Sequence, residues 1–264
     1  MDKQPFFHIA LYQQDIVWEQ PEANFRRVEQ AFDEALAQAS FRPDMLIMPE
    51  TFTTGFGDHM ARQAEPPLGA TYRFASALAS KYDAMVAATW TVNVEGRIFN
   101  RLHLVKPDGG VATYDKAHTF RMSSEAAQLQ RGTAITNVEW RGWHIRPAVC
   151  YDLRFPIWLR NSANLDYDLL LVCANWPGSR HEAWSTLLKA RAIENLAYVA
   201  GCNRVGTDGT GIDYAGCSAV VDYKGFPLVE APNGAERVVC ATLDAEKLAT
   251  FRSHWPFNLD FDNQ

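Results

Sequence analysis

Two short runs of this chain are apolar at almost every position. They are DMLIMPE (44–50) and DLLLVCANW (168–176). Continuous apolar runs of this length predict strands that are buried on both faces, since a strand with one wet face would alternate polar and apolar residues. Each run follows a helical segment, so that helix–strand units at 21–50 and 155–176 echo each other. Strands that need cover on both faces favour a layered α/β domain over an all-β barrel.

The remaining segments supply further helices and strands. Helical stripes of apolar residues predict helices at 21–40, 69–83, 155–165 and 181–196. Strand-like runs lie at 6–13, 84–94, 97–109 and 111–115, in a hairpin at 137–150 that turns at Arg141-Gly142, and in three further runs after residue 196. A chain of 264 residues can bury one full core, and no linker divides it. We therefore expect a single domain over 1–264 with a core at about 6–244, and a tail at 245–264 that packs on a partner subunit or on its own domain.

Composition excludes several classes of partner. The formal net charge of −6 argues against a surface for nucleic acid or anionic membrane. No segment is long and apolar enough to span a bilayer. The first residues, MDKQPFFHIALYQQ, enter a strand-like pattern directly, without the apolar core and cleavage site of a signal peptide. The five cysteines form no CxxC pair, and we expect a reduced, cytoplasmic protein without a disulfide framework or zinc site.

Three reactive side chains stand at the ends of predicted strands. Glu50 ends DMLIMPE, Lys116 follows VATYD (111–115), and Cys150 closes HIRPAVC (144–150). In open α/β sheets the C-terminal ends of the strands face the substrate. A carboxylate, an ammonium and a thiol, each delivered by a separate strand, therefore predict a site for cysteine-based acyl transfer.

This set of groups suits the hydrolysis of an amide. A free thiol titrates near pH ~8.5, so a nucleophilic cysteine needs a base or a cation nearby. Glu50 can take the proton of Cys150 and later give it to departing ammonia, while Lys116 holds both groups in place and donates to the oxyanion. The backbone N–H of Tyr151, directly after the nucleophile, is the natural second oxyanion donor. The sequence has no Gly-rich phosphate loop before the site and no His pair at metal-ligand spacing, and we expect neither a cofactor nor a metal.

The flanking residues add a resemblance to a known family. MPETFTTGF around Glu50, YDKAHTF around Lys116 and VCYDLRFP around Cys150 resemble, in order and spacing, the signature segments of the nitrilase superfamily of carbon–nitrogen hydrolases. The similarity runs from about residue 6 to residue 244. It implies a four-layer αββα sandwich, with two β-sheets between helical layers. It also implies pairing of subunits through the nucleophile-side helices, which gives a homodimer or a higher homo-oligomer.

The resemblance also implies a role for a second glutamate. The family often has one in the loop after the lysine, and Glu125 in RMSSEAAQLQRG is its best match. That residue would orient the substrate amide and support Lys116. Taken alone, Glu125 could instead be an acid in the first turn of a helix that Ser123 or Ser124 caps.

Within the superfamily, YDKAHTF and CYDLRFP look most like the ω-amidase branch. Such enzymes hydrolyse the terminal amide of 2-oxoglutaramate or 2-oxosuccinamate to the acid and ammonia. A substrate of this kind has a carboxylate at its far end, which an arginine can bind bidentately. Arg154 is the first candidate for this role and Arg121 the second, and three aromatic residues could wall a pocket for a short linear acid: Phe120, Tyr151 and Trp176.

Other interpretations of the same residues stay open. His118 raises the alternative of a Cys–His dyad, although structural support is the expected role. Arg154 could pair with Asp152, Trp176 could be core packing, and the other four cysteines are expected in the core. The alternative functions are an N-carbamoyl-amine amidohydrolase or a nitrilase of the same superfamily, and, from another class, a catalytically silent dimeric binding protein.

Overall fold

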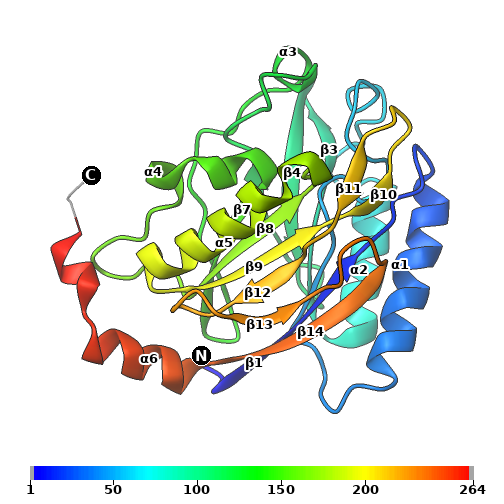
Figure 1. Cartoon of the computed structure of the whole chain (residues 1–264). Coiled ribbons are helices and arrows are strands. Elements are labelled where there is room, and N and C mark those ends of the chain that lie inside the picture. Colours follow the sequence, from blue (N-terminus) through cyan, green and yellow to red (C-terminus); the bar gives the residue numbers. More distant parts are fainter. Residues whose placement is uncertain (1–2, 262–264) are drawn as a thin grey trace.

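The computed structural model describes residues 3–261 of the chain. In that range two six-stranded β-sheets face each other between layers of helices, as Figure 1 shows. The first sheet has the order β14-β1-β2-β3-β4-β5 and the second the order β13-β12-β9-β8-β7-β6. A short ribbon, β10-β11, accompanies them. The two fully apolar strands led us to expect a layered α/β domain, and the resemblance to the nitrilase superfamily implied the two sheets between helical layers.

The strands have the following bounds. Those of the first sheet are β1 (Phe6–Gln13), β2 (Met45–Ile47), β3 (Met85–Val94), β4 (Arg97–Val105), β5 (Val111–Asp115) and β14 (Arg237–Asp244). Those of the second are β6 (Val138–Trp140), β7 (Trp143–Val149), β8 (Leu169–Ala174), β9 (Tyr198–Asn203), β12 (Ala219–Val221) and β13 (Pro227–Glu230). The ribbon consists of β10 (Val205–Thr207) and β11 (Asp213–Ala215).

The α-helices of the described part of the chain are α1 (Pro21–Leu36), α2 (Ala70–Tyr82), α3 (Glu125–Gln128), α4 (Pro156–Leu159), α5 (His181–Asn195) and α6 (Ala245–His254). Short 3₁₀ turns are η1 (Cys150–Arg154), η2 (Gly178–Arg180) and η3 (Phe257–Asp260). No helix among residues 3–261 is long and apolar enough to cross a membrane.

Alternation along the parallel strands explains the four layers. In β8, Leu169 and Leu171 enter the core between the two sheets, whereas Leu170 and Val172 pack on the outer face with Trp184 of α5. Because successive side chains of a strand point to opposite faces, a strand with helices on one side and a sheet on the other is apolar throughout.

The first sheet follows the same rule. In β1, Ile9 lies in the core between the sheets, whereas Ala10 joins the outer cluster that contains Val28 and Phe32 of α1. The layers are therefore α1 and α2, the first sheet, the second sheet, and α4 with α5 (Figure 1).

Several element boundaries differ from the sequence-based expectation. The helix predicted at 155–165 ends at Leu159, since the chain turns there and Asn161 is bound by Asn195 and Tyr167. Helix α1 ends at Leu36 rather than at residue 40. The predicted hairpin turn is present, with positive φ angles of 51° at Arg141 and 78° at Gly142, as a two-residue turn requires.

The C-terminal part of the chain has more regular structure than predicted. Six strands instead of three follow residue 196 within the described residues, because two of the expected runs each divide into two strands and β13 lies outside the expected runs. The tail begins with α6, whose first N–H groups are capped by the Asp244 side chain. Its Leu248 is buried in the core between the sheets, and Arg252 donates to Asp168 and to two backbone carbonyls. Residues 262–264 of the predicted tail lie outside the described residues.

Candidate active site

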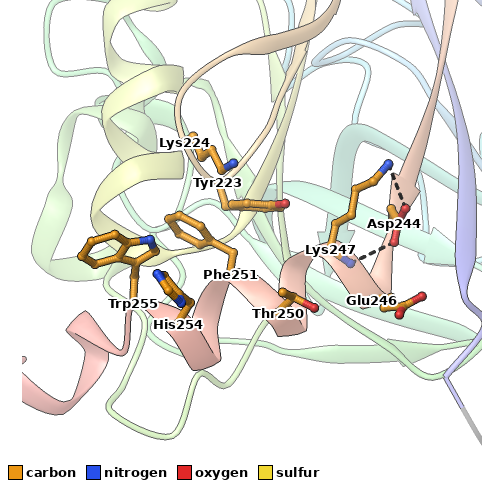
Figure 2. Close-up of a pocket in the computed structure, with 9 residues that line it drawn as sticks. All are labelled: Tyr223, Lys224, Asp244, Glu246, Lys247, Thr250, Phe251, His254 and Trp255. Carbon is orange, nitrogen blue, oxygen red and sulfur yellow. Dashed lines mark hydrogen bonds and ion pairs between the residues drawn. The ribbon is translucent and has the colours of Figure 1, made fainter.

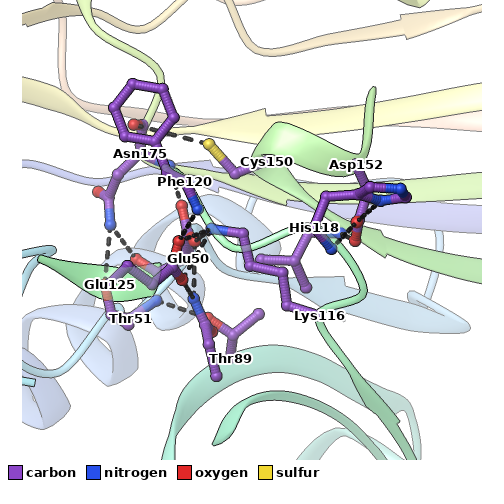
Figure 3. Close-up of polar contacts among 12 residues, drawn as sticks. Glu50, Thr51, Thr89, Lys116, His118, Phe120, Glu125, Cys150, Asp152 and Asn175 are labelled. Atoms are coloured by element: carbon purple, nitrogen blue, oxygen red, sulfur yellow. Dashed lines mark hydrogen bonds and ion pairs between the residues drawn. The ribbon is translucent and has the colours of Figure 1, made fainter. Parts of the chain in front are cut away.

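The three predicted reactive residues come together where the two sheets meet. Glu50 follows β2, and Lys116 follows β5 in the same sheet, while Cys150 follows β7 in the other sheet (Figure 3). Lys116 Nζ lies 2.9 Å from Glu50 Oε1. The thiol of Cys150 lies at 3.8 Å from the carbonyl oxygen of Asn175, whose backbone N–H donates to Glu50 Oε2 at 2.9 Å. Strand ends thus deliver the carboxylate, the ammonium and the thiol to one place.

Glu125 completes the charged cluster. Both of its carboxylate oxygens lie 2.9 Å from Lys116 Nζ, and Oε2 also accepts the backbone N–H of Phe120 at 2.6 Å. Glu50, Lys116 and Glu125 are almost completely buried, with exposed fractions of 0%, 1% and 0%. The ammonium therefore bridges two buried carboxylates, and its position is fixed from both sides.

Two asparagines that the sequence did not point to hold Glu50 in place. Asn100 of β4 donates its side-chain amide to Glu50 Oε1 at 2.8 Å and to Glu125 Oε1 at 3.1 Å. Asn175 donates its side-chain amide to the carbonyl of Glu50 at 2.7 Å and to Thr51 Oγ1 at 2.8 Å. For Asn175 the available signal was a polar residue at the end of an otherwise apolar strand run, since buried polar groups need partners. Asn100 lies in a strand with other polar residues, which gave no such signal.

The nucleophile turn has an unusual backbone. Cys150 has a φ of 44°, in the left-handed region that non-glycine residues seldom adopt. Asp152, completely buried two residues later, stabilises the turn by accepting the N–H of Val149 at 3.0 Å and the hydroxyl of Tyr114 at 2.8 Å. Strain of this kind persists where neighbouring contacts over-determine the backbone, and it is common at functional sites.

The environment of the thiol disfavours its ionisation. Burial raises the pKa of Cys150 well above its ordinary value, the negative charge of Glu50 raises it further, and the charge of Lys116 opposes both effects. The two carboxylates keep the pKa of Lys116 above its usual range despite burial, so this residue stays charged. Cys150 is therefore a neutral thiol beside an acceptor carboxylate, and its proton must leave as it attacks.

Burial acts on Glu125 as well. Loss of hydration raises the pKa of its carboxyl, Lys116 lowers it, and the charge of Glu50 raises it. The net effect raises the pKa of Glu125, because burial dominates and two carboxylates here share a single cation.

A pocket of about 150 Å³ opens onto Cys150. Sites for drug-sized ligands usually occupy about 300–1,000 Å³, so this pocket suits a short molecule. Four of the residues that the sequence proposed for substrate contact line it: Phe120, Tyr151, Arg154 and Trp176. Arg121 is exposed and does not line this pocket. Arg180, which sequence reasoning missed, lines the pocket instead.

His118 does not face the thiol. Its backbone N–H and its ring Nδ1 both contact Asp152 Oδ1, at 2.9 and 2.8 Å, and its ring stacks on Phe155 with centroids 3.8 Å apart. These contacts give it the structural role that the sequence favoured over a Cys–His dyad. Asp152 thus binds His118 and not Arg154, so the alternative in which Arg154 pairs with Asp152 does not hold.

Among the other cysteines, Cys173 and Cys202 lie fully buried in β8 and β9, within the core between the sheets. Cys217 and Cys240 are partly buried. All five are free thiols. The core role predicted for the two buried ones follows from their place on the inner faces of parallel strands.

Comparison with known proteins defines the class. The family model for carbon–nitrogen hydrolases matches residues 8–253. The chain therefore belongs to the carbon–nitrogen hydrolase family, and it is a hydrolase that acts on carbon–nitrogen bonds other than peptide bonds. The predicted membership of the nitrilase superfamily is thereby confirmed.

Individual relatives narrow this class to amidases. The omega-amidase YafV of Yersinia enterocolitica is 42% identical over 254 residues, which make up 96% of each chain. The 2-oxoglutaramate amidase of Bacillus subtilis (strain 168) is 30% identical over 94% of this chain and 95% of its own. The crystal structure of XC1258 from Xanthomonas campestris, a CN-hydrolase superfamily protein with an arsenic adduct in the active site, superposes with a TM-score of 0.93, at 40% identity and 99% coverage of both chains. The protein is thus an amidase, and the predicted α/β sandwich of four layers is confirmed.

Proposed function

We propose that this amidase hydrolyses the terminal amide of short 2-oxo dicarboxylic acid monoamides, such as 2-oxoglutaramate and 2-oxosuccinamate, through a cysteine thioester. The observation that carries the proposal is the placement of a single thiol, Cys150, on a small pocket beside the buried Glu50–Lys116–Glu125 cluster. The names of the relatives from Yersinia and Bacillus support the substrate class.

In the first half of the reaction, Cys150 Sγ attacks the amide carbon while its proton passes to Glu50. The resulting tetrahedral oxyanion accepts hydrogen bonds from Lys116 Nζ and from the backbone N–H of Tyr151. Glu50 then gives the proton to the amide nitrogen, the carbon–nitrogen bond breaks, and ammonia leaves. The acyl group remains on the enzyme as a thioester.

In the second half, water replaces ammonia in the site. Glu50 removes a proton from the water, hydroxide adds to the thioester carbon, and the thiolate leaves and recovers the proton. The products are the carboxylic acid and the free enzyme. Glu125 supports this cycle by binding Lys116 together with Glu50, and the asparagine contacts keep Glu50 in one orientation.

The test is the release of ammonia from 2-oxoglutaramate and succinamate by the wild type and by Cys150→Ala. We expect release by the wild type, loss of nearly all of it in Cys150→Ala, and a retained fold by circular dichroism. Cys217→Ala is a matched control, because this partly buried thiol does not line the pocket. Equal release of ammonia by the wild type and by Cys150→Ala would exclude Cys150 as the nucleophile. Release from carbamoyl amines or nitriles alone would favour the alternative activities within the superfamily.

We also propose that the protein is a homodimer that pairs through its nucleophile-side helices. Three large apolar side chains on this side are exposed: Ile157 of α4 at 74%, Ile193 of α5 at 53%, and Phe226 at 66%. The turn before Phe226 lies against Ile193, since a Cβ placed on Gly225 would be 2.7 Å from Ile193 Cδ1. Exposed apolar groups gathered in this way are typical of subunit interfaces.

The same side of the molecule carries a hollow of about 560 Å³ along α6 (Figure 2). Tyr223, Phe251 and Trp255 line it, and Trp255 is 49% exposed. Light scattering should give twice the chain mass of 29.7 kDa for the wild type and the single mass for Ile193→Asp. Leu68→Asp, an equally exposed position near α2, should leave the dimer intact. A monomeric wild type would contradict the proposal.

We place this activity in the cytoplasm. A thioester mechanism needs the Cys150 thiol in its reduced form, which reducing compartments maintain. Detection of the native protein in a cytosolic fraction would test this placement.

A further inference from the structure

Two arginines from separate turns line the pocket that opens onto Cys150. Arg154 ends η1 and Arg180 ends η2. Within residues 3–261, neither guanidinium has a hydrogen bond or an ion pair with the protein. Both side chains are exposed to the pocket, so their guanidinium groups are accessible to a bound molecule.

Aromatic walls of the pocket hold both side chains. The Arg154 guanidinium carbon lies 4.7 Å from the ring centroid of Trp176, and that of Arg180 lies 5.5 Å from the ring centroid of Phe120. The indole N–H of Trp176 donates to the carbonyl of Arg180 at 2.9 Å, which ties the second arginine to the wall that supports the first. Contact with a ring leaves the N–H edges of a guanidinium free to bind an anion.

Charge is distributed unequally along the pocket. Its lining contains no Asp or Glu among the described residues, and apart from the two arginines it carries no cationic side chain. At its inner end, the charge of Lys116 is already balanced by Glu50 and Glu125. An anionic group on a bound molecule therefore finds uncompensated positive charge only at the arginines.

We infer that Arg154 and Arg180 together bind the carboxylate at the end of the substrate opposite the scissile amide, and that this pair selects acidic ω-amides over neutral ones. The inference rests on the proposed function and deepens it. A carboxylate accepts forked hydrogen bonds from guanidinium groups, and such charge-assisted bonds are stronger than those between neutral groups. The small volume of the pocket, about 150 Å³, limits the span between that carboxylate and the amide carbon at Cys150.

The experiment compares Arg154→Gln, Arg180→Gln and the wild type on succinamate and succinamide. The two molecules have the same shape, but the far end is a carboxylate in one and a neutral amide in the other. We expect each variant to lower kcat/KM for succinamate by roughly 10- to 100-fold, mainly through KM, and to leave succinamide nearly unchanged. Arg180→Lys should recover part of the loss, because it keeps the charge but not the fork.

Arg26→Gln is the matched control, since Arg26 is an exposed arginine of α1 outside the pocket. Equal losses on both substrates, or no loss on succinamate, would overturn the role of the arginine pair while leaving the amidase proposal intact.

A second readout does not depend on turnover. Succinate should protect Cys150 of the wild type from iodoacetamide, and this protection should weaken at least tenfold in Arg180→Gln. If the wild type released no ammonia from 2-oxoglutaramate or succinamate, the proposed function would fail, and protection by succinate would still decide whether the pair binds a carboxylate. Equal protection of Cys150 in the wild type and in the variant would contradict the binding of a carboxylate by Arg154 and Arg180.

Discussion

Asp152 accepts two hydrogen bonds from His118, one from its backbone N–H at 2.9 Å and one from its ring at 2.8 Å. The same carboxylate accepts the N–H of Val149, next to the nucleophile. His118 is two residues beyond Lys116, so one buried side chain joins the lysine segment to the turn of Cys150. This link crosses from one sheet to the other.

We expect Asp152→Asn to lower kcat by about 10²-fold with little change in KM, because a shift of about 1 Å in a reacting group can have that effect. Both oxygens of Asp152 accept hydrogen bonds, so the side-chain NH₂ of an asparagine would face N–H or O–H groups that also donate. We expect this to lower the free energy of unfolding by about 1–3 kcal/mol. Kinetics on succinamate and urea unfolding measure the two effects. Asp166→Asn, at an exposed position, is the control. A variant that changed only KM would speak against the link.

Glu50→Gln should separate the reactivity of the thiol from catalysis. Removal of the Glu50 charge lowers the pKa of Cys150, since that charge is one of the causes that raise it and Lys116 remains. Each unit of decrease gives about tenfold more thiolate at neutral pH. The variant should therefore react faster with iodoacetamide than the wild type does, and yet release ammonia far more slowly. Slower alkylation in the variant would show that Glu50 activates the resting thiol.

Lys116→Met should strongly destabilise the fold. It would leave two carboxylates side by side in a fully buried place, and loss of one partner of a buried ion pair costs about 3–5 kcal/mol. The added change Glu125→Gln should recover part of this loss. The control is Lys81→Met, because Lys81 also contacts two carboxylates but lies 38% exposed, where such pairs contribute about 0–1 kcal/mol. Equal effects of the two lysine changes in urea unfolding would contradict this account.

Stability should decline in mild alkali because of the buried thiols. Burial raises the pKa of Cys173 and of Cys202, so both stay protonated in the folded protein while the unfolded chain ionises near pH ~8.5. The folded state then binds more protons, and each thiol lowers the free energy of unfolding by about 1.4 kcal/mol between about pH 7.5 and about pH 9.5. Urea unfolding of Cys202→Ala should show a pH dependence that is smaller by this amount. An unchanged pH dependence would exclude the effect.

Much of the architecture follows from local patterns in the sequence. The continuous apolar runs at 44–50 and 168–176 predicted buried strands in a layered domain, and β2 and β8 do pack against a helix layer on one face and the other sheet on the opposite face. The number of layers was implied by the resemblance to the nitrilase superfamily. The length of the helix predicted at 155–165 was overestimated. Asn161 in its second half instead bonds to Asn195 of α5 and to Tyr167, and no local pattern reveals these contacts.

The site was predictable to a different degree. Glu50, Lys116 and Cys150 could be found because each follows a strand, and the structure brings them together; their catalytic roles stay predictions. Asn100 and Arg180 could not be found in this way. The first faces the carboxylates only because of the register of β4, and the second reaches the pocket only through the turn that follows Trp176.

Glu50 and Lys116 belong to one sheet, whereas Cys150 and Asn175 belong to the other. Neither half of the sandwich holds the nucleophile together with its base. A state in which the sheets had moved apart by a few ångströms could keep every helix and strand and still lack all of its chemistry. The turnover rate of this protein therefore reports on the packing of the two sheets against each other. Circular dichroism, which measures secondary structure, does not report on it.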